Sequence, residues 1–129
     1  MNLREVEIFK PYGNEFPEYL MLDAGCPTEA FAHWENSELL RIAKRGHEIL
    51  GLYAMERRNQ DIFELFGVIV EPQVRKQGLG RWLVGHAIGV AESKGGRRVT
   101  LPHTGASRCF AHIGFQPAEV GWFFDLIPE

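Results

Sequence analysis

Residues 62–80 read IFELFGVIVEPQVRKQGLG, and this stretch decides the fold. Its first nine residues are apolar except for Glu64, which is typical of a central strand covered on both faces. Pro72 ends that strand because proline has no N–H to donate to a sheet. Gly78 and Gly80 then introduce a helical pattern. The stretch therefore predicts a buried strand, a loop and the N-terminus of a helix.

The helix that follows has the most regular pattern in the chain. Apolar residues recur at spacings of four, four and three from Leu79 to Val90, and Gly95-Gly96 supplies a stop, so we predict a helix over 78–94. The first N–H groups of a helix have no partners within it and lie at the positive end of its dipole. Glycines would let the oxygens of an anion approach this backbone. We therefore expect a phosphate-binding site at residues 75–81.

Two other phosphate-binding classes are excluded by the same residues. The dinucleotide fingerprint needs a third glycine three positions after the second, where Leu83 stands. The P-loop needs Gly-Lys-Ser/Thr, which the chain lacks. The turn therefore predicts neither a Rossmann domain nor a P-loop nucleotidase.

The rest of the chain supplies further strands and helices around this junction. The order of elements predicts an α/β (α+β) fold in one domain over 1–129, with a mixed, mostly antiparallel central sheet of about six to seven strands and helices on both faces. The predicted strands are 3–10, 39–44, 48–57, 62–70, 99–101 and 121–127, and the predicted helices are two short ones within 15–36, 78–94 and 104–113.

Composition and charge limit the partners. The 129 residues carry a formal net charge of -3, whereas nucleic-acid-binding domains present a basic surface, so nucleic acid is not an expected partner. No apolar run approaches the roughly 20 residues that span a bilayer. The N-terminal residues alternate charged and apolar side chains, unlike a secretory signal, so we expect a cytoplasmic protein. Cys26 and Cys109 are expected to be free thiols.

Two motifs together resemble a known family. Residues 75–80 read Arg-x-x-Gly-x-Gly after a strand that ends Val-x-Pro, and residues 106–115 read Ala-x-x-x-Phe-x-x-x-Gly-Phe. With the matching order of elements, residues 39–115 resemble the GNAT superfamily of N-acetyltransferases. The resemblance implies binding of acetyl-coenzyme A (acetyl-CoA), with its pyrophosphate on the glycine-rich turn, its pantetheine arm beside the strand and its thioester near Ile69.

The resemblance also implies individual roles. His103 stands where the family commonly has an Asn that touches the coenzyme, although capping of a loop is the alternative. Phe110 replaces the Tyr that often protonates the departing thiolate, and its apolar neighbours favour a packing role. The residues assigned to the coenzyme are Val68, Ile69, Val70, Arg75, Lys76, Gln77, Gly78, Leu79, Gly80, Arg81, His103 and Phe110.

Glu64 is the candidate general base. An alkylammonium acceptor must lose a proton before it attacks a thioester, and a carboxylate in apolar surroundings has a raised pKa that suits this task. The alternative is that Glu64 is a salt-bridge partner or a solvent-facing residue. No His, Cys or Asp spacing predicts a metal site.

The predicted function is transfer of an acetyl group from acetyl-CoA to a primary amine, on a small molecule or on a protein. The alternative is a non-catalytic acyl-CoA sensor or partner-binding module on the same fold. The aromatic segment 121–127 suits either pairing across a homodimer or closing its own sheet.

Overall fold

The computed structural model describes residues 3–13, 15–26, 28–75, 77–101, 116–117 and 122–126. Within them a seven-stranded sheet has the order β1-β2-β3-β4-β5-β7-β6, and only the β4–β5 pair is parallel. The strands are β1 (Glu7–Phe9), β2 (Leu39–Arg45), β3 (Glu48–Arg57), β4 (Ile62–Val70), β5 (Arg98–Leu101), β6 (Gln116–Pro117) and β7 (Trp122–Asp125). The helices are α1 (Glu18–Asp23), α2 (Thr28–Glu35) and α3 (Leu79–Ser93), with 3-10 helices η1 (Leu3–Glu5) and η2 (Pro72–Val74).

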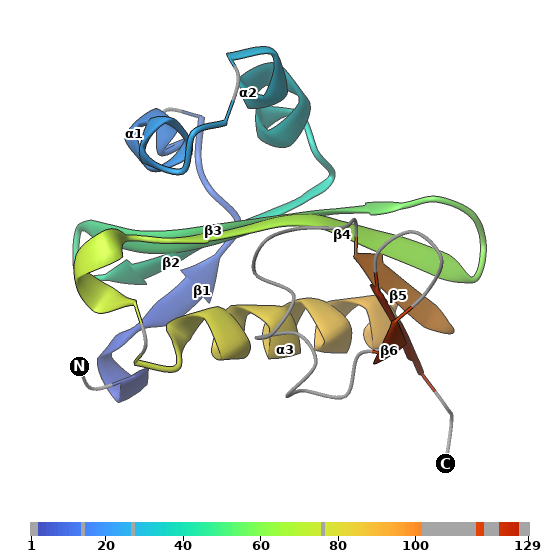
Figure 1. Cartoon of the computed structure of the whole chain (residues 1–129). Coiled ribbons are helices and arrows are strands. Elements are labelled where there is room, and N and C mark those ends of the chain that lie inside the picture. The colour runs from blue at the N-terminus through green and yellow to red at the C-terminus, as the bar shows by residue number, and fades with distance from the viewer. Residues whose placement is uncertain are drawn as a thin grey trace.

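Helices cover both faces of the sheet. Figure 1 shows α1 and α2 on one face and α3 running beneath the other. The predicted fold class is therefore confirmed, as are the hairpin of β2 and β3, the central strand β4 and the helix α3.

The predicted helix 104–113 lies outside the described residues. β7 lies between β5 and β6, so of the two alternatives for the aromatic segment it closes its own sheet.

Two predictions at the chain's ends are wrong in detail. The predicted strand 3–10 is shorter, because the N–H of Val6 donates to the carbonyl of Leu3 (3.1 Å) and closes the 3-10 helix η1 first. The two-residue strand β6 was not predicted, because two residues are too few to show any alternation.

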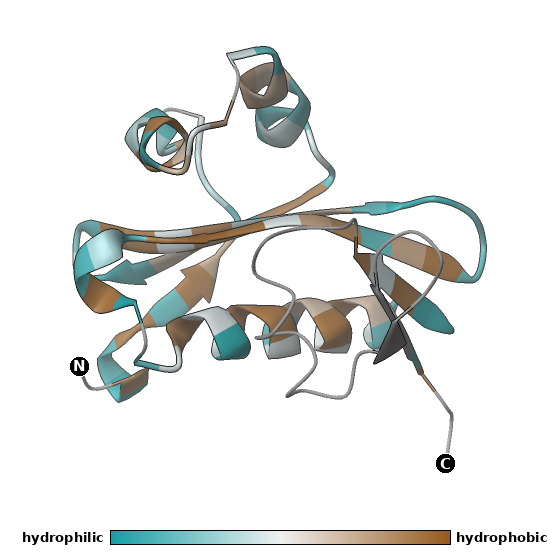
Figure 2. Ribbon diagram, in the orientation of Figure 1, coloured by the Kyte–Doolittle hydropathy of each residue, from teal (hydrophilic) through white to brown (hydrophobic). Residues whose placement is uncertain are grey.

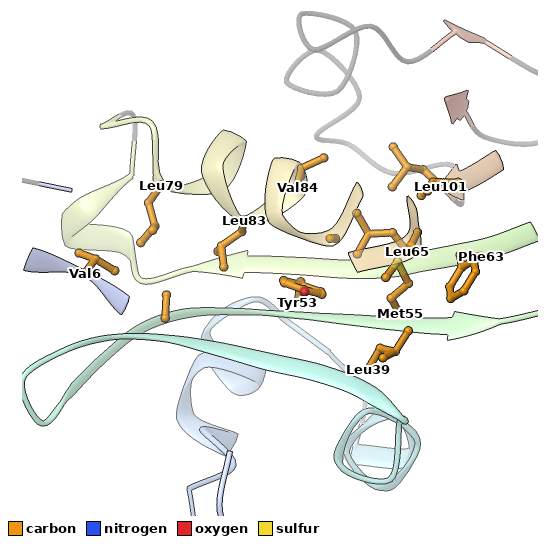
Figure 3. Close-up of a cluster of buried hydrophobic side chains, with 14 of the residues drawn as sticks. Val6, Leu39, Tyr53, Met55, Phe63, Leu65, Leu79, Leu83, Val84 and Leu101 are labelled. Carbon is orange, nitrogen blue, oxygen red and sulfur yellow. The ribbon is translucent and has the colours of Figure 1, made fainter. Parts of the chain in front are cut away.

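The sheet separates two hydrophobic cores. The larger core lies against α3, whose apolar residues recur along the helix (Figure 2). Figure 3 shows Leu83 of α3 directed at the strands near Tyr53, with Leu79 on the side of Val6 and Val84 on the side of Leu101. The smaller core lies against α1 and α2. Its buried members are Leu20, Met21, Trp34, Leu40, Ile42, Leu52, Ala54 and Ile69.

A β-bulge changes the alternation of side chains along β4. Met55 of β3 pairs with Leu65 and the preceding Ala54 pairs with Gly67, so Phe66 is an extra residue in β4. Leu65 and Val68 both pack against the α3 core, whereas Phe66 packs against the smaller core. The bulge therefore explains why the strand looked apolar on both faces with no clear period of two.

Gly67 leaves room for a buried tryptophan. A Cβ atom at this position would lie 1.8 Å from Cη2 of Trp34, which is 8% exposed. We expect Gly67→Ala to destabilise the protein by about 3 kcal/mol, because the indole ring must leave its place in the core. Denaturant unfolding measures this. Gly89→Ala is the matched control, since nothing lies within 4 Å of its added methyl group. This variant should not lower the free energy of unfolding. Equal stability of the two variants would contradict the packing of Trp34 against Gly67.

Candidate functional site

Strand β4 pairs with β5 over a short distance only. The paired residues are Ile62 to Glu64, whereas β4 continues to Val70 alongside β3. The N–H of Glu71 donates to the carbonyl of Leu50 on β3 (2.8 Å), so alternation directs the polar backbone groups of Val70 and Val68 away from β3. Within the described residues, no strand pairs with this edge of β4 beyond Glu64. The edge can therefore accept a ligand that offers amide groups.

The glycine-rich turn joins this edge to α3. Gly78 caps the helix with φ of 90°, a left-handed conformation that strains any residue with a side chain. Since glycine has no side chain, it cannot accept a hydrogen bond from the first turn of α3 as a Ser or Asp cap would. The N–H groups of that turn can therefore bind an anion. A Cβ atom on Gly80 would lie 3.6 Å from Cγ2 of Val70, which places this turn directly beside the end of β4.

Arg75 fastens the turn to two other elements. Its Nε donates to the carbonyl of Val70 (3.0 Å), and its guanidinium lies 3.3 Å from Oδ2 of Asp23 at the end of α1. Both side chains of the ion pair are about half exposed, so the contact with Asp23 contributes little stability by itself. The arrangement links the candidate coenzyme turn with the helix pair on the other face of the sheet.

A shallow hollow of about 640 Å³ borders the same turn. It is lined by Leu3, Arg4, Gly78, Arg81, Trp82 and Gly85. Its two charged lining residues, Arg4 and Arg81, are both cationic, and no described acidic residue lines the hollow. The charge suits an anionic ligand at the N-terminus of α3.

The candidate coenzyme residues thus divide into three groups. Backbone groups of Val68, Val70 and the turn lie along one continuous path. The side chains of Ile69 and Leu79 are buried in the two cores, so only the main chain of these residues is available to a ligand. Lys76, His103 and Phe110 lie outside the described residues, and their roles stay predictions.

Glu64 lies on the face of the sheet that α2 covers. Its side chain is 29% exposed, and its Oε1 accepts a hydrogen bond from the guanidinium of Arg58. The same guanidinium lies 3.0 Å from Oε2 of Glu56, which pairs with Glu64 across the two strands. The apolar surroundings expected for Glu64 are therefore wrong, because its neighbours come from an adjacent strand and a turn rather than from its own strand. Its role as base stays a prediction.

A histidine extends this polar network. Nε2 of His33 on α2 lies 2.6 Å from Oε1 of Glu56, and its ring stacks on Phe66 with centroids 4.6 Å apart and planes 3° apart. Sequence reasoning missed Glu56, Arg58 and His33. The register of a hairpin turning at residues 59–61 would have placed Glu56 opposite Glu64, but nothing along the sequence pointed to His33.

The buried tyrosine on the other face is not a candidate acid. The hydroxyl of Tyr53 lies 2.8 Å from Nδ1 of His86 on α3, and the tyrosine side chain is fully buried. Burial raises the pKa of Tyr53 far above its usual value. Burial and, secondarily, the charge of Arg41 lower the pKa of His86, so this pair is neutral near pH 7. We regard it as a structural hydrogen bond within the core.

The sequence profile described as the acetyltransferase (GNAT) family matches residues 6–115 of the chain. The chain belongs to the GNAT acetyltransferase family. The predicted resemblance is thereby confirmed, and it extends beyond the segment that suggested it. No curated protein matches this GNAT acetyltransferase in a direct sequence comparison.

Solved structures share the fold of this GNAT acetyltransferase. A GNAT family acetyltransferase from Elizabethkingia anophelis, crystallised with acetyl-CoA bound, has a TM-score of 0.80 and 22% identity, over 89% of this chain and 78% of its own. An IAA acetyltransferase from Bacillus cereus has a TM-score of 0.79 and 21% identity, over 88% and 79%. Ard1 from Thermoplasma volcanium has a TM-score of 0.82 and 11% identity, over 96% and 99%.

Three further features concern metal ligands, membrane-spanning helices and cysteines. The described residues contain no group of three or more His, Cys, Asp and Glu side chains placed to hold a metal ion. Among the described helices, none is both long and apolar enough to cross a bilayer. Cys26 is a free thiol, and Cys109 lies outside the described residues.

Proposed function

We propose that this GNAT acetyltransferase transfers an acetyl group from acetyl-CoA to a primary amine by direct attack in a ternary complex. One observation carries the proposal. β4 leaves its pairing with β5 after Glu64 and leads, through η2 and the glycine-rich turn, into an α3 N-terminus that no side chain caps. The relative from Elizabethkingia anophelis, which holds acetyl-CoA, supports the choice of donor.

The coenzyme would lie along the path from the turn to the edge of β4. Its pyrophosphate would accept hydrogen bonds from the N–H groups of Gly78 to Arg81, assisted by the positive end of α3. The amides of its pantetheine arm would pair with the backbone of Val68 and Val70, as an added strand would. The carbonyl of Val70 already accepts a hydrogen bond from Arg75, but a carbonyl oxygen has two lone pairs and can accept another.

The chemistry requires one proton acceptor. Glu64, or a water molecule that it orients, takes a proton from the acceptor's ammonium group. The neutral nitrogen then attacks the thioester carbonyl carbon, a C–N bond forms and the C–S bond breaks. The sulfur leaves with the bonding electrons as a thiolate, which takes a proton from solvent. The second proton released by the nitrogen also passes to solvent.

The proposal predicts both binding and turnover. Acetyl-CoA at about 100 times its Kd should raise the melting temperature by roughly 8 to 11 °C, whereas NAD and ATP should not. Acetyl-CoA together with a panel of primary amines should release free thiol, measured with a thiol reagent.

The two measurements separate the candidate functions. No shift with millimolar acetyl-CoA would reject the coenzyme site altogether. A shift without thiol release for any small amine, amino acid or lysine peptide would favour the non-catalytic acyl-CoA sensor. Asp23, Glu29 and Glu35 are three of the four acidic residues of the α1–α2 segment, where a cationic acceptor would approach.

A further inference from the structure

We infer that Arg58 is a positioning residue for Glu64, and that Glu56 and His33 hold Arg58 in place; the inference rests on the proposed role of Glu64 as proton acceptor. The four side chains form one continuous chain of contacts on the α2 face of the sheet. None of them is adjacent in sequence to another, so the folded hairpin and α2 bring them together.

The contacts are distributed so that the two middle groups, Arg58 and Glu56, each meet two others. One terminal nitrogen of Arg58 contacts Oε1 of Glu64, and the other lies 3.0 Å from Oε2 of Glu56. The remaining oxygen of Glu56 lies 2.6 Å from His33. A planar guanidinium held at both ends fixes the direction of each carboxylate. Oε2 of Glu64 therefore keeps a defined direction, and no described side chain hydrogen-bonds to it.

The chain of contacts begins and ends on β4. Glu64 is at one end, and at the other end His33 stacks on Phe66, the extra residue of the bulge. Phe66 lies two residues after Glu64, so the alternation of β4 places the Phe66 ring on the same face as Glu64. Through His33, the position of α2 is coupled to the carboxylate that would take the proton.

Among the residues that the structure describes, Arg58 is the cation that contacts Glu64. Across the β4–β5 pair, Glu64 faces the uncharged Thr100, and the next pair on that face involves Arg98, which binds Asp125 at 2.7 Å. The negatively charged residue directly opposite Glu64 on β3 is Glu56. Without Arg58, two carboxylates would face each other on neighbouring strands with no described cation between them. Arg58 thus lies between the two carboxylates and directs that of Glu64.

The test is the pH dependence of kcat at saturating acetyl-CoA and amine. Arg58→Ala should move the acid limb of this profile to higher pH, because Glu64 would then face the like-charged Glu56 with no cation between them. Arg58→Lys should restore the position of the limb, because it keeps the charge, but turnover should stay several-fold low because one ammonium cannot bridge both carboxylates. The acetyl-CoA melting shift should be unchanged in both variants, which shows that they fold.

Arg57→Ala is the matched control. Arg57 is the neighbouring residue, but it lies on the opposite face, 4.8 Å above the ring of Phe63, and its guanidinium donates to the carbonyl of Lys94. Its removal should leave the acid limb in place. An equal displacement of the limb in Arg57→Ala would overturn the inference, because the effect would then be one of general stability or surface charge.

A double variant shows whether Arg58 acts through Glu64. In a Glu64→Gln background, Arg58→Ala should cause no further change in kcat or in the acid limb. A further loss as large as in the wild-type background, or an unmoved limb in Arg58→Ala, would overturn the positioning role while Glu64 remained the base. A normal kcat in Glu64→Gln alone would instead reject the base, and the inference with it.

Discussion

Gly80→Asp is expected to abolish binding of acetyl-CoA without harming the fold. A carboxylate in the first turn of α3 would lie where the pyrophosphate must approach the backbone. Two like charges about 4 Å apart near a protein surface repel by about 4 kcal/mol, which corresponds to a roughly thousandfold loss of affinity. The same carboxylate stabilises the helix by about 0.3 to 1 kcal/mol through the dipole. Equilibrium titration and the ligand-dependent melting shift measure the two effects separately.

Gly80→Ala is the control for crowding. Its methyl group would make an ordinary contact at 3.6 Å with Val70, so this variant should fold. If it binds the coenzyme and Gly80→Asp does not, charge at the helix N-terminus decides binding. Tight binding by Gly80→Asp would show that the pyrophosphate lies elsewhere.

Glu64→Gln is expected to lower kcat about a hundredfold or more near neutral pH, the usual contribution of a positioned general base. Acetyl-CoA affinity should not change, because Glu64 lies at the paired end of β4, away from the glycine-rich turn. The rate should partly recover as pH rises toward the amine pKa of about 10, since more of the acceptor is then already neutral. Thiol release between pH 6 and 10 measures the profile.

Glu48→Gln provides the comparison for Glu64→Gln. Glu48 is an exposed carboxylate at the opposite end of the hairpin, where it pairs with Arg45 at 2.9 Å. This variant should keep the wild-type rate at every pH. If Glu64→Gln also keeps it, Glu64 is a structural partner of Arg58 and another group accepts the proton.

Much of the fold could be predicted because its signals are local. The run around Glu64, the proline that ends it and the period of α3 each occupy a few consecutive residues, and a helix or strand there follows from nearest neighbours alone. Short elements gave no such signal. The residues Leu3–Glu5 alternate like a strand, yet one local hydrogen bond makes them a 3-10 helix.

The glycine-rich turn and the surroundings of Glu64 also differ in how far the sequence alone could predict them. The glycine-rich turn is contiguous in sequence, so its residues identify it. The surroundings of Glu64 are not contiguous, since they depend on the register between β3 and β4 and on the docking of α2. The bulge at Phe66 was also hidden, because apolar residues on both sides of it conceal the change of face.

The bulge at Phe66 means that two separate requirements act on β4, namely packing against α3 and support of the polar network around Glu64. A lineage that lost Phe66 would still place Leu65 and Val68 on the α3 face, since Gly67 alone would then stand between them. Selection for packing of the α3 core therefore gives no reason to keep the extra residue. Deletion would instead remove the local bend that follows the last pairing with β5, together with the ring on which His33 stacks. We expect natural variation to preserve the length of this strand for the sake of activity, even where the identities of its core residues drift.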